Sequence, residues 1–207
     1  MRLATQVTCE EYINGKLWCS ATLSCCPWHP EGGCGFARHG TYPRVKPANV
    51  YVARWYCPKA RRTVSALPDC LASHRSGTLN ECESFVRAVE QAPSQEAACQ
   101  SLRTDIDLPG ALRYLTRLVR DVHRALSAIK GLLPTQFIHA PTISDFTPLI
   151  DSSTVLMSLR DIASRYLPLL PAPLGFNPLA FSTHRTLTPV QHRTGRDPPV
   201  AFIDASN

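Results

Sequence analysis

Four residues in the first third of the chain have the types and the spacing of metal ligands. Cys26, His29 and Cys34 fall within nine residues, and Cys57 follows 23 residues later. Three thiolates and one imidazole form a common ligand set of structural zinc sites, in which the ion joins two turns at the ends of short strands. We therefore predict one zinc ion. It would hold together a zinc-ribbon-like unit that has too few large apolar side chains for a core of its own.

Two features leave this ligand set open. A complete second Cys-x-x-Cys turn would have a cysteine at the position of Ala60, so His29 would supply the ligand that this turn lacks. Cys25 competes with Cys26 for the first ligand position. The alternative is that these cysteines are buried thiols in a ribbon that has lost its metal. The chain has nine cysteines, and this odd number argues against a framework of disulfides within it.

The basic residues gather in two segments on either side of an acidic one. Residues 38–75 contain eight arginines and lysines and one acid, and residues 112–130 contain five bases and one acid. Residues 76–111, between them, contain six acids and two arginines. Two basic surfaces of this kind could meet a polyanion. The alternative is ordinary solvated surface.

The second basic segment is predicted to lie on a long helix. Pro109 suits a first helical turn, and the apolar pattern continues to Lys130, with Gly131 as the stop. At about 100° per residue, all four arginines of this helix fall on one stripe. The opposite side carries the apolar residues that must be core: Leu115, Leu118, Val122, Leu126 and Ile129.

Two shorter helices are predicted before the long one. Thr78 and Glu81 match a capping box, and apolar residues at helical spacing follow as far as Gln91. Ser94 can cap a second helix over residues 95–102. Three helices in this order, with a short second one, favour a helix-turn-helix arrangement.

The remaining elements are less regular in sequence. Runs with β propensity occupy residues 36–42 and 50–56, and a weak helical signal occurs around residues 10–16. Residues 132–151 are expected to be irregular. Ser152 or Ser153 can then cap a helix that continues through Tyr166, before Pro168, Pro171 and Pro173.

These elements predict an α+β protein: a small β zinc-ribbon-like unit over residues 25–68, followed by a mainly helical, helix-turn-helix-like domain over residues 78–134. Residues 1–24 are expected to form an N-terminal segment, 135–174 a proline-punctuated helical extension, and 175–207 a disordered tail. The chain has 207 residues, 44% of them hydrophobic, which is enough for one or two small domains and excludes wholesale disorder.

The apolar residues are distributed as in a protein that does not enter a membrane. No apolar run approaches the ~18 residues of a membrane span, and residues 1–12 lack the apolar stretch of a secretory signal. We therefore expect a cytoplasmic protein without a membrane partner, associated with the nucleoid if it binds DNA.

The residues around the candidate ligands resemble the amino-terminal zinc ribbon of transposase-like proteins from bacterial insertion sequences. The runs that carry the resemblance are Cys34-Gly-Phe-Ala-Arg-His-Gly-Thr-Tyr-Pro-Arg44 and Arg54-Trp-Tyr-Cys-Pro-Lys-Ala-Arg-Arg-Thr-Val-Ser-Ala-Leu-Pro-Asp69. The chain departs from the family pattern in three places: Ala60 replaces a ligand cysteine, Val64 replaces a phenylalanine, and extra residues separate Cys26 from Cys34. The resemblance covers about residues 25–134. It implies binding of DNA, with a helix-turn-helix module after the ribbon.

No catalytic constellation is found in the sequence. The resemblance transfers no catalytic residues, the acids after Gly131 do not end convincing hydrophobic strands, and there is neither a Gly-x-Ser-x-Gly elbow nor a Gly-rich phosphate loop. One alternative is an enzyme fragment that keeps a metal-dependent nuclease activity through Asp145 or Asp161.

The main hypothesis is a DNA-binding protein of mobile-element origin without its own catalytic domain. Its partner would be double-stranded DNA, and a transposase or a second copy of the chain could be a further partner. The alternatives are a protein-interaction adaptor, which would dock a partner on the proline-punctuated half, and a decayed transposase fragment. The predicted DNA contacts are the arginines of the two basic segments: Arg38, Arg44, Arg54, Arg61, Arg62, Arg113, Arg117, Arg120 and Arg124.

Overall fold

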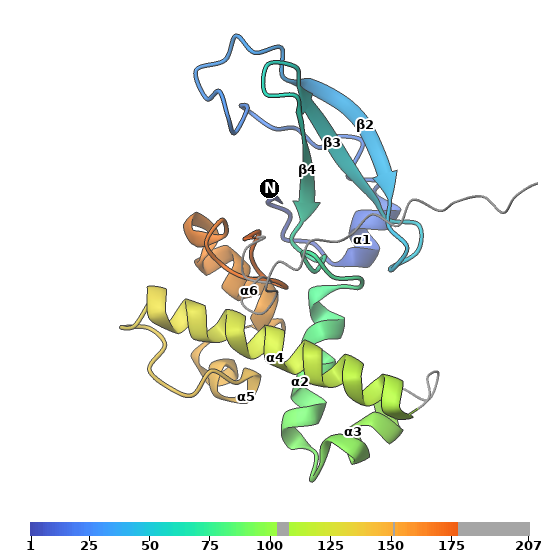
Figure 1. Cartoon of the computed structure of the whole chain (residues 1–207), viewed down its shortest axis with the longest axis vertical. Coiled ribbons are helices and arrows are strands. Elements are labelled where there is room, and N and C mark those ends of the chain that lie inside the picture. The colour runs from blue at the N-terminus through green and yellow to red at the C-terminus, as the bar shows by residue number, and fades with distance from the viewer. Residues whose placement is uncertain (103–107, 151, 178–207) are drawn as a thin grey trace, which may run out of the picture.

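Within the described part of the chain, a four-stranded sheet lies at one end of the molecule and six α-helices lie at or below its other end (Figure 1). The computed structural model describes residues 1–102, 108–150 and 152–177. The sheet comes first in the chain, and the part after it is mostly helical. The predicted α+β class is therefore confirmed. Residues 178–207, most of the expected tail, lie outside the described residues.

The sheet has the order β1-β4-β3-β2. Its strands are β1 (Arg2–Leu3), β2 (Ala37–Pro43), β3 (Tyr51–Cys57) and β4 (Arg62–Pro68). β2, β3 and β4 pair antiparallel, whereas β1 pairs parallel with β4. Sequence analysis predicted β2 and β3 to within one residue at each end, but it assigned no strand to β4 or to β1.

One face of the sheet is covered by the N-terminal part of the chain. Ala53 and Trp55 of β3 alternate with Arg54, and they pack with Ala21 and Ala66 in a small apolar cluster. At the lower end of the sheet, Tyr12 is fully buried in a second cluster beneath the strands. Tyr12 belongs to α1 (Cys9–Asn14), which begins and ends earlier than the helical signal predicted around residues 10–16.

The three predicted helices after the sheet are present. They are α2 (Leu79–Gln91), α3 (Gln95–Leu102) and α4 (Leu108–Leu132). Thr78 and Glu81 form the reciprocal capping box at the start of α2, as predicted. The Ser94 hydroxyl accepts the Ala97 amide at 3.1 Å at the start of α3. The sequence signals therefore placed α2 and α3 correctly, and α4 extends beyond its predicted limits by one residue at its start and two at its end.

The chain after α4 differs from the prediction in two places. Residues 132–151, expected to be irregular, contain α5 (Ile143–Phe146) and a 3₁₀ turn, η1 (Thr147–Leu149). The next helix is α6 (Val155–Ile162), which begins after Thr154 and not after Ser152 or Ser153, and a separate 3₁₀ turn, η2 (Ser164–Tyr166), follows it. The Ser152 hydroxyl accepts the Thr154 amide at 3.2 Å, so this serine holds the turn before the helix.

One hydrophobic core joins α2, α4, α5 and α6. The apolar side of α4 is buried in it as predicted, and Phe137 stacks on Phe146 with ring centroids 4.7 Å apart. Leu170 and Leu174, in the proline-punctuated segment, are also fully buried there. Residues 135–150 and 152–174 therefore pack into the same core as the helices that precede them.

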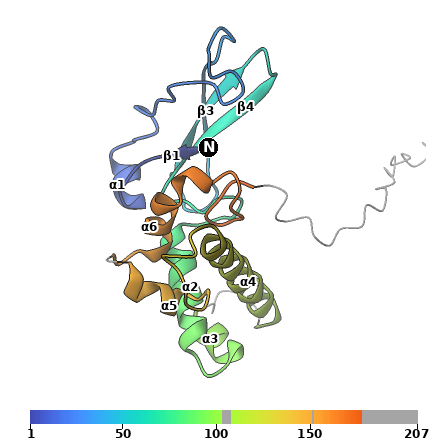
Figure 2. The ribbon, with the colours of Figure 1, turned by 90° about the vertical axis from the view of Figure 1, so that its left-hand side faces the viewer.

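A buried arginine of α6 connects the sheet to the helices. Arg160 is fully buried, and its guanidinium donates to five backbone carbonyls, three in the chain leaving β4 and two in the segment after η2: Pro68, Asp69, Leu71, Pro173 and Leu174. Burial lowers the pKa of Arg160 to about 10, so the group stays protonated at neutral pH. Figure 2 shows α6 directly beneath the sheet, where this contact is made.

The longest helix is amphipathic and not uniformly apolar. α4 has 25 residues, with a buried apolar side and an exposed arginine side. Within the residues that the structure describes, no helix combines the length and the apolar character that a membrane crossing requires.

Candidate metal centre and basic surfaces

Cys26, His29, Cys34 and Cys57 come together at the far end of the sheet. Their ligand atoms all lie within 4.8 Å of one another. The structure therefore brings together the four residues that were predicted as ligands. The three cysteines are buried and His29 is half-buried. Cys25 is exposed beside Ser24, so Cys26 and not Cys25 takes the first ligand position.

The spacing of these atoms fits a tetrahedral ion. With Zn–S bonds of about 2.3 Å and Zn–N bonds of about 2.0–2.1 Å, sulfur and nitrogen ligands of one zinc lie about 3.6 Å apart. His29 Nδ1 is 3.6 Å from Cys26 Sγ and 3.4 Å from Cys57 Sγ. The cluster could therefore hold a metal ion. Four protein ligands leave no open coordination position, which is typical of a structural and not a catalytic site.

Tight turns aim backbone amides at the sulfur atoms. Amides of Trp28 and His29 approach Cys26, and the amide of Phe36 approaches Cys34. The Ala60 amide donates to Cys57 Sγ at 3.3 Å. The second turn therefore keeps the backbone geometry of a ligand turn although Ala60 lacks a thiol, and the fourth ligand comes from His29.

The backbone conformation after Cys34 explains why residue 35 is a glycine. Gly35 has a φ of 68°, in the left-handed region that favours glycine. A Cβ at this position would lie 3.1 Å from Pro58 Cγ, in the opposite turn. Gly35 therefore allows the two ligand-bearing turns to approach each other closely.

The pKa values of Cys26 and Cys34 are shifted in opposite directions. Burial raises the pKa of Cys26, but hydrogen bonds from the His29 side chain and from backbone amides outweigh burial, and the net effect lowers the pKa to about 7. Burial raises the pKa of Cys34 above its ordinary value. The Cys26 thiolate is the form that a metal ion requires, and it is already accessible near neutral pH.

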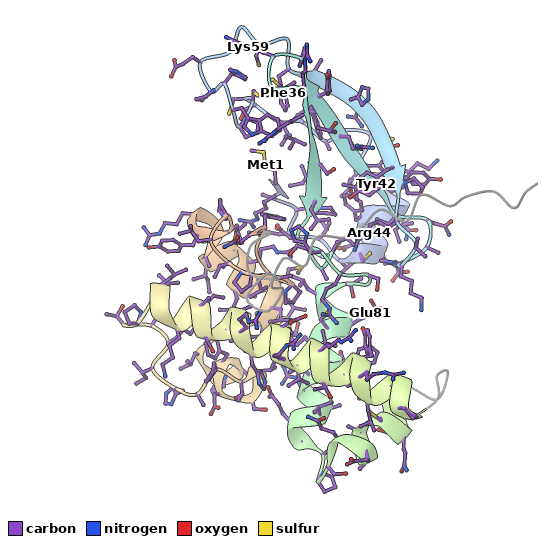
Figure 3. The ribbon with its side chains drawn as sticks, in the orientation of Figure 1. Met1, Phe36, Tyr42, Arg44, Lys59 and Glu81 are labelled. Carbon is purple, nitrogen blue, oxygen red and sulfur yellow. The ribbon has the colours of Figure 1, made fainter. Side chains whose placement is uncertain are left out.

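Little other packing holds this end of the sheet together. Among the residues that the structure describes, the local apolar cluster adds to the three cysteines the partly buried Trp28, Phe36 and Ala60 and no others. Figure 3 shows Phe36 and Lys59 at this end of the molecule, far from the helical core. An ion in the cluster would therefore be the main link between residues 25–34 and the strands.

The other cysteines have separate roles. Cys82 is buried on the apolar side of α2, and Cys99 is buried on α3. Cys9 and Cys70 interact through their side chains, an arrangement that their spacing in the sequence did not reveal. The interaction lowers the pKa of the Cys9 thiol and raises that of the Cys70 thiol.

Two of the predicted DNA contacts are engaged within the fold. Arg38 lies over the Trp55 ring and donates to the Cys19 and Ala21 carbonyls at 2.9 and 3.0 Å. Arg44 donates to the carbonyls of Ala72 and Arg75 in the turn that follows β4. Both guanidinium groups therefore position backbone segments.

The other sheet arginines are placed differently. Arg54 lies 5.5 Å from the Tyr42 ring, on the face opposite Trp55, and its buried Nε has no hydrogen-bond partner among the described residues. Arg61 is exposed in the turn between β3 and β4. Arg62 is also exposed, and its guanidinium lies 5.9 Å from the Trp28 ring.

The arginine stripe of α4 faces outward. The four residues of the stripe are exposed: Arg113, Arg117, Arg120 and Arg124. The residues on the opposite side of the helix are buried. Arg120 Nε lies 3.6 Å from Asp121, and Asp121 also pairs with Arg75. Near the start of α4, Arg113 and Arg117 border an open depression of about 440 Å³, which His74 and Arg75 line from the other side.

No protein-family model matches the chain, and neither a curated protein nor a solved structure matches it. The resemblance to transposase-like proteins therefore stays a prediction from the residues quoted above.

Proposed function

We propose that this protein binds double-stranded DNA through the arginine side of α4. The observation that carries the proposal is the stripe of four exposed arginines on one helix whose opposite side is fully buried. Guanidinium groups are suited to phosphate because they are planar, always charged and able to donate two parallel hydrogen bonds. A long helix that presents such a stripe can lie along the sugar-phosphate backbone or enter a groove.

The arrangement of the two halves supports a shared contact surface. In Figure 2, α1 and residues 15–36 lie on one side of the sheet, whereas α4 lies toward the opposite side of the molecule. Arg54 is on the face of the sheet opposite Trp55, because the two residues alternate along β3, and its side chain is partly exposed there. One duplex could therefore contact the sheet through Arg54 and the exposed turn residue Arg61 while it contacts α4. Arg62 is paired with Cys57, so its side chain is on the other face of the sheet, near Trp28.

In this proposal the Cys₃His cluster holds a structural zinc ion. Cys26, His29, Cys34 and Cys57 would be its ligands, and the ion would supply the folding free energy that the small local core does not. Its effect on DNA binding would be indirect, because it fixes the turn that carries Arg61 and the strand that carries Arg54 and ends at Cys57.

The test is retardation of duplex DNA by the purified chain in a low-salt gel. Replacement of all four α4 arginines by alanine should abolish retardation, because phosphate neutralisation supplies most of the free energy of non-specific binding. All four side chains are exposed, so circular dichroism should show an unchanged fold. Unchanged retardation by the quadruple variant would remove α4 from the mechanism. Absence of retardation by the parent chain, together with capture of a protein partner, would favour the adaptor hypothesis.

An origin in a mobile element, association with the nucleoid and a transposase or second copy as partner extend the same proposal. They rest on the sequence resemblance and not on contacts in the structure. Protection mapping on DNA from the ends of an insertion sequence, against random DNA of equal length, would test the origin. Preferential protection of the element ends is expected if the resemblance reflects function.

A further inference from the structure

We infer that a backbone phosphate of the bound DNA sits in the depression between the turn after β4 and the first half of α4. The inference rests on the proposed function and specifies where along the arginine stripe the strongest contact lies. The depression has a volume of about 440 Å³ and is open to solvent, so a phosphodiester and part of its sugar can enter it.

Basic side chains line this depression from two elements. His74 and Arg75 come from the turn after β4, and Arg113 and Arg117 come from consecutive turns of α4. Arg120 and Arg124 lie farther along the helix and do not line it. The first half of the stripe therefore differs from the second, because Arg113 and Arg117 face this wall across the depression and Arg120 and Arg124 do not border it.

The turn that forms this wall is fixed by the fold. Arg44 donates to the Ala72 carbonyl at 3.3 Å and also to the Arg75 carbonyl, which pins the backbone on both sides of His74. Arg75 itself pairs with Asp121 of α4, and its guanidinium lies 5.8 Å from the Tyr114 ring. The wall is therefore set before a ligand arrives, so binding orders few additional side chains. Figure 3 shows Arg44 at this junction between the sheet and the helices.

The charge of the depression favours one anionic group. Asp121 balances Arg75, so the excess positive charge comes from Arg113 and Arg117. These two guanidinium groups lie one helical turn apart on the same side of α4, within reach of one phosphate that carries a single negative charge. Arg113 or Arg117 can donate hydrogen bonds to the phosphate, while the wall formed by His74 and Arg75 limits the movement of the phosphate.

The experiment compares two pairs of substitutions that remove the same charge from the same helix. Arg113→Ala with Arg117→Ala should weaken the affinity for a fluorescent duplex at least tenfold more than Arg120→Ala with Arg124→Ala, measured by anisotropy at fixed salt. A third variant, Ser76→Tyr, fills the depression from an exposed position and removes no charge. It should weaken binding by a similar factor to the first pair.

The outcomes separate this inference from the proposed function. Equal losses for the two pairs, with wild-type affinity for the Ser76→Tyr variant, would overturn the phosphate site and leave the arginine stripe in place. Wild-type affinity for all of these variants and for the quadruple variant would overturn both. A selective loss in the first pair and in the Ser76→Tyr variant supports the site.

Discussion

At the level of single residues, the Cys₃His cluster depends on side chains from two turns and one strand end. His29 is close to two sulfur atoms of the cluster, that of Cys26 in its own turn and that of Cys57 at the end of β3. It replaces the ligand that Ala60 lacks, while the Ala60 amide still donates to Cys57. A conventional pair of Cys-x-x-Cys turns is therefore not required for four ligands to meet.

Substitution of a buried ligand should release the metal. Cys34→Ser and Cys57→Ser should each lower the zinc content from about one ion per chain to near zero, because a structural zinc site needs its complete ligand set. Cys25→Ser is the matched control, since Cys25 is adjacent in sequence but exposed and outside the cluster. Elemental analysis of the purified proteins gives the result, and a parent chain that carries no zinc would contradict the assignment.

Arg160 is a second residue on which the fold depends. Arg160→Ala should lower the free energy of unfolding by about 3 kcal/mol or more, because several buried carbonyls would lose the charged donor that the guanidinium provides. Arg165→Ala, at an exposed position three residues beyond the end of the same helix, should change it by less than about 0.5 kcal/mol. Urea denaturation followed by circular dichroism compares the two. Equal small effects would show that the Arg160 network contributes little.

At the level of elements, Glu90 of α2 holds the start of α5. Its carboxylate accepts the Ile143 and Ser144 amides, both at 2.9 Å, and the Ser144 hydroxyl at 2.8 Å. His123 of α4 lies 2.8 Å from the same carboxylate. Three helices therefore meet at one acidic side chain, which satisfies the first amides of a helix too short to be stable alone.

This arrangement predicts a specific dependence of stability on pH. Burial raises the pKa of Glu90, but hydrogen bonds from His123, Ile143 and Ser144 lower it overall, below the usual value of 4.5. A group with a lowered pKa in the folded state stabilises the fold above its unfolded pKa, and this contribution is lost as the pH falls through the folded value. Glu90→Gln should therefore cost about 1–3 kcal/mol at pH 7 and progressively less below pH ~4.5.

The control for this prediction is Glu96→Gln, at an exposed position in the first turn of α3. Its effect should be below about 1 kcal/mol, the usual limit for an exposed charge near a helix start. Urea unfolding at several pH values distinguishes the two variants. A Glu90→Gln penalty that stays constant from pH 7 to pH 3 would show that the carboxylate charge is not what stabilises α5.

The same elements explain how far the sequence predicts the structure. The bounds of α2 and α3 could be predicted because their caps are local, at Thr78 and Ser94. α5 also has a local cap, because the Thr142 hydroxyl accepts a hydrogen bond from the Asp145 amide, but its four residues are too few for a periodic signal. Its first two amides are bound by Glu90, more than 50 residues earlier in the chain, and this contact could not be predicted. α1 carries a local signal that was missed, the capping box of Thr8 and Glu11.

In the candidate sites, too, features set by the local sequence could be predicted and features set by tertiary contacts could not. The four metal ligands could be predicted because zinc ligands have characteristic types and spacings, and the α4 stripe because helical periodicity is strong over 25 residues. The engagement of Arg38 and Arg44 with backbone carbonyls depends on tertiary contacts, so their charge alone suggested a surface role. The burial of Arg160 also depends on tertiary contacts, because arginine is mostly exposed in folded proteins and its position in the sequence gives no sign of burial.

At the level of the whole molecule, two salt bridges add to the Arg160 contacts between sheet and helices. Arg2 of β1 pairs with Asp69 at 2.7 Å and with Asp161 of α6 at 2.6 Å. The sheet and α6 are therefore held in a fixed relation. Under the proposed function, one duplex that contacts both basic segments would require such a fixed relation.

The most direct test of the central claim is the salt dependence of duplex binding by the zinc-loaded chain. If the four α4 arginines each neutralise a phosphate, log K should fall with log salt concentration with a slope of about −3.6 or steeper. The slope for the quadruple alanine variant should be shallower by about that amount, where any binding remains. A parent chain whose affinity for duplex DNA does not change between low and high salt would contradict the account.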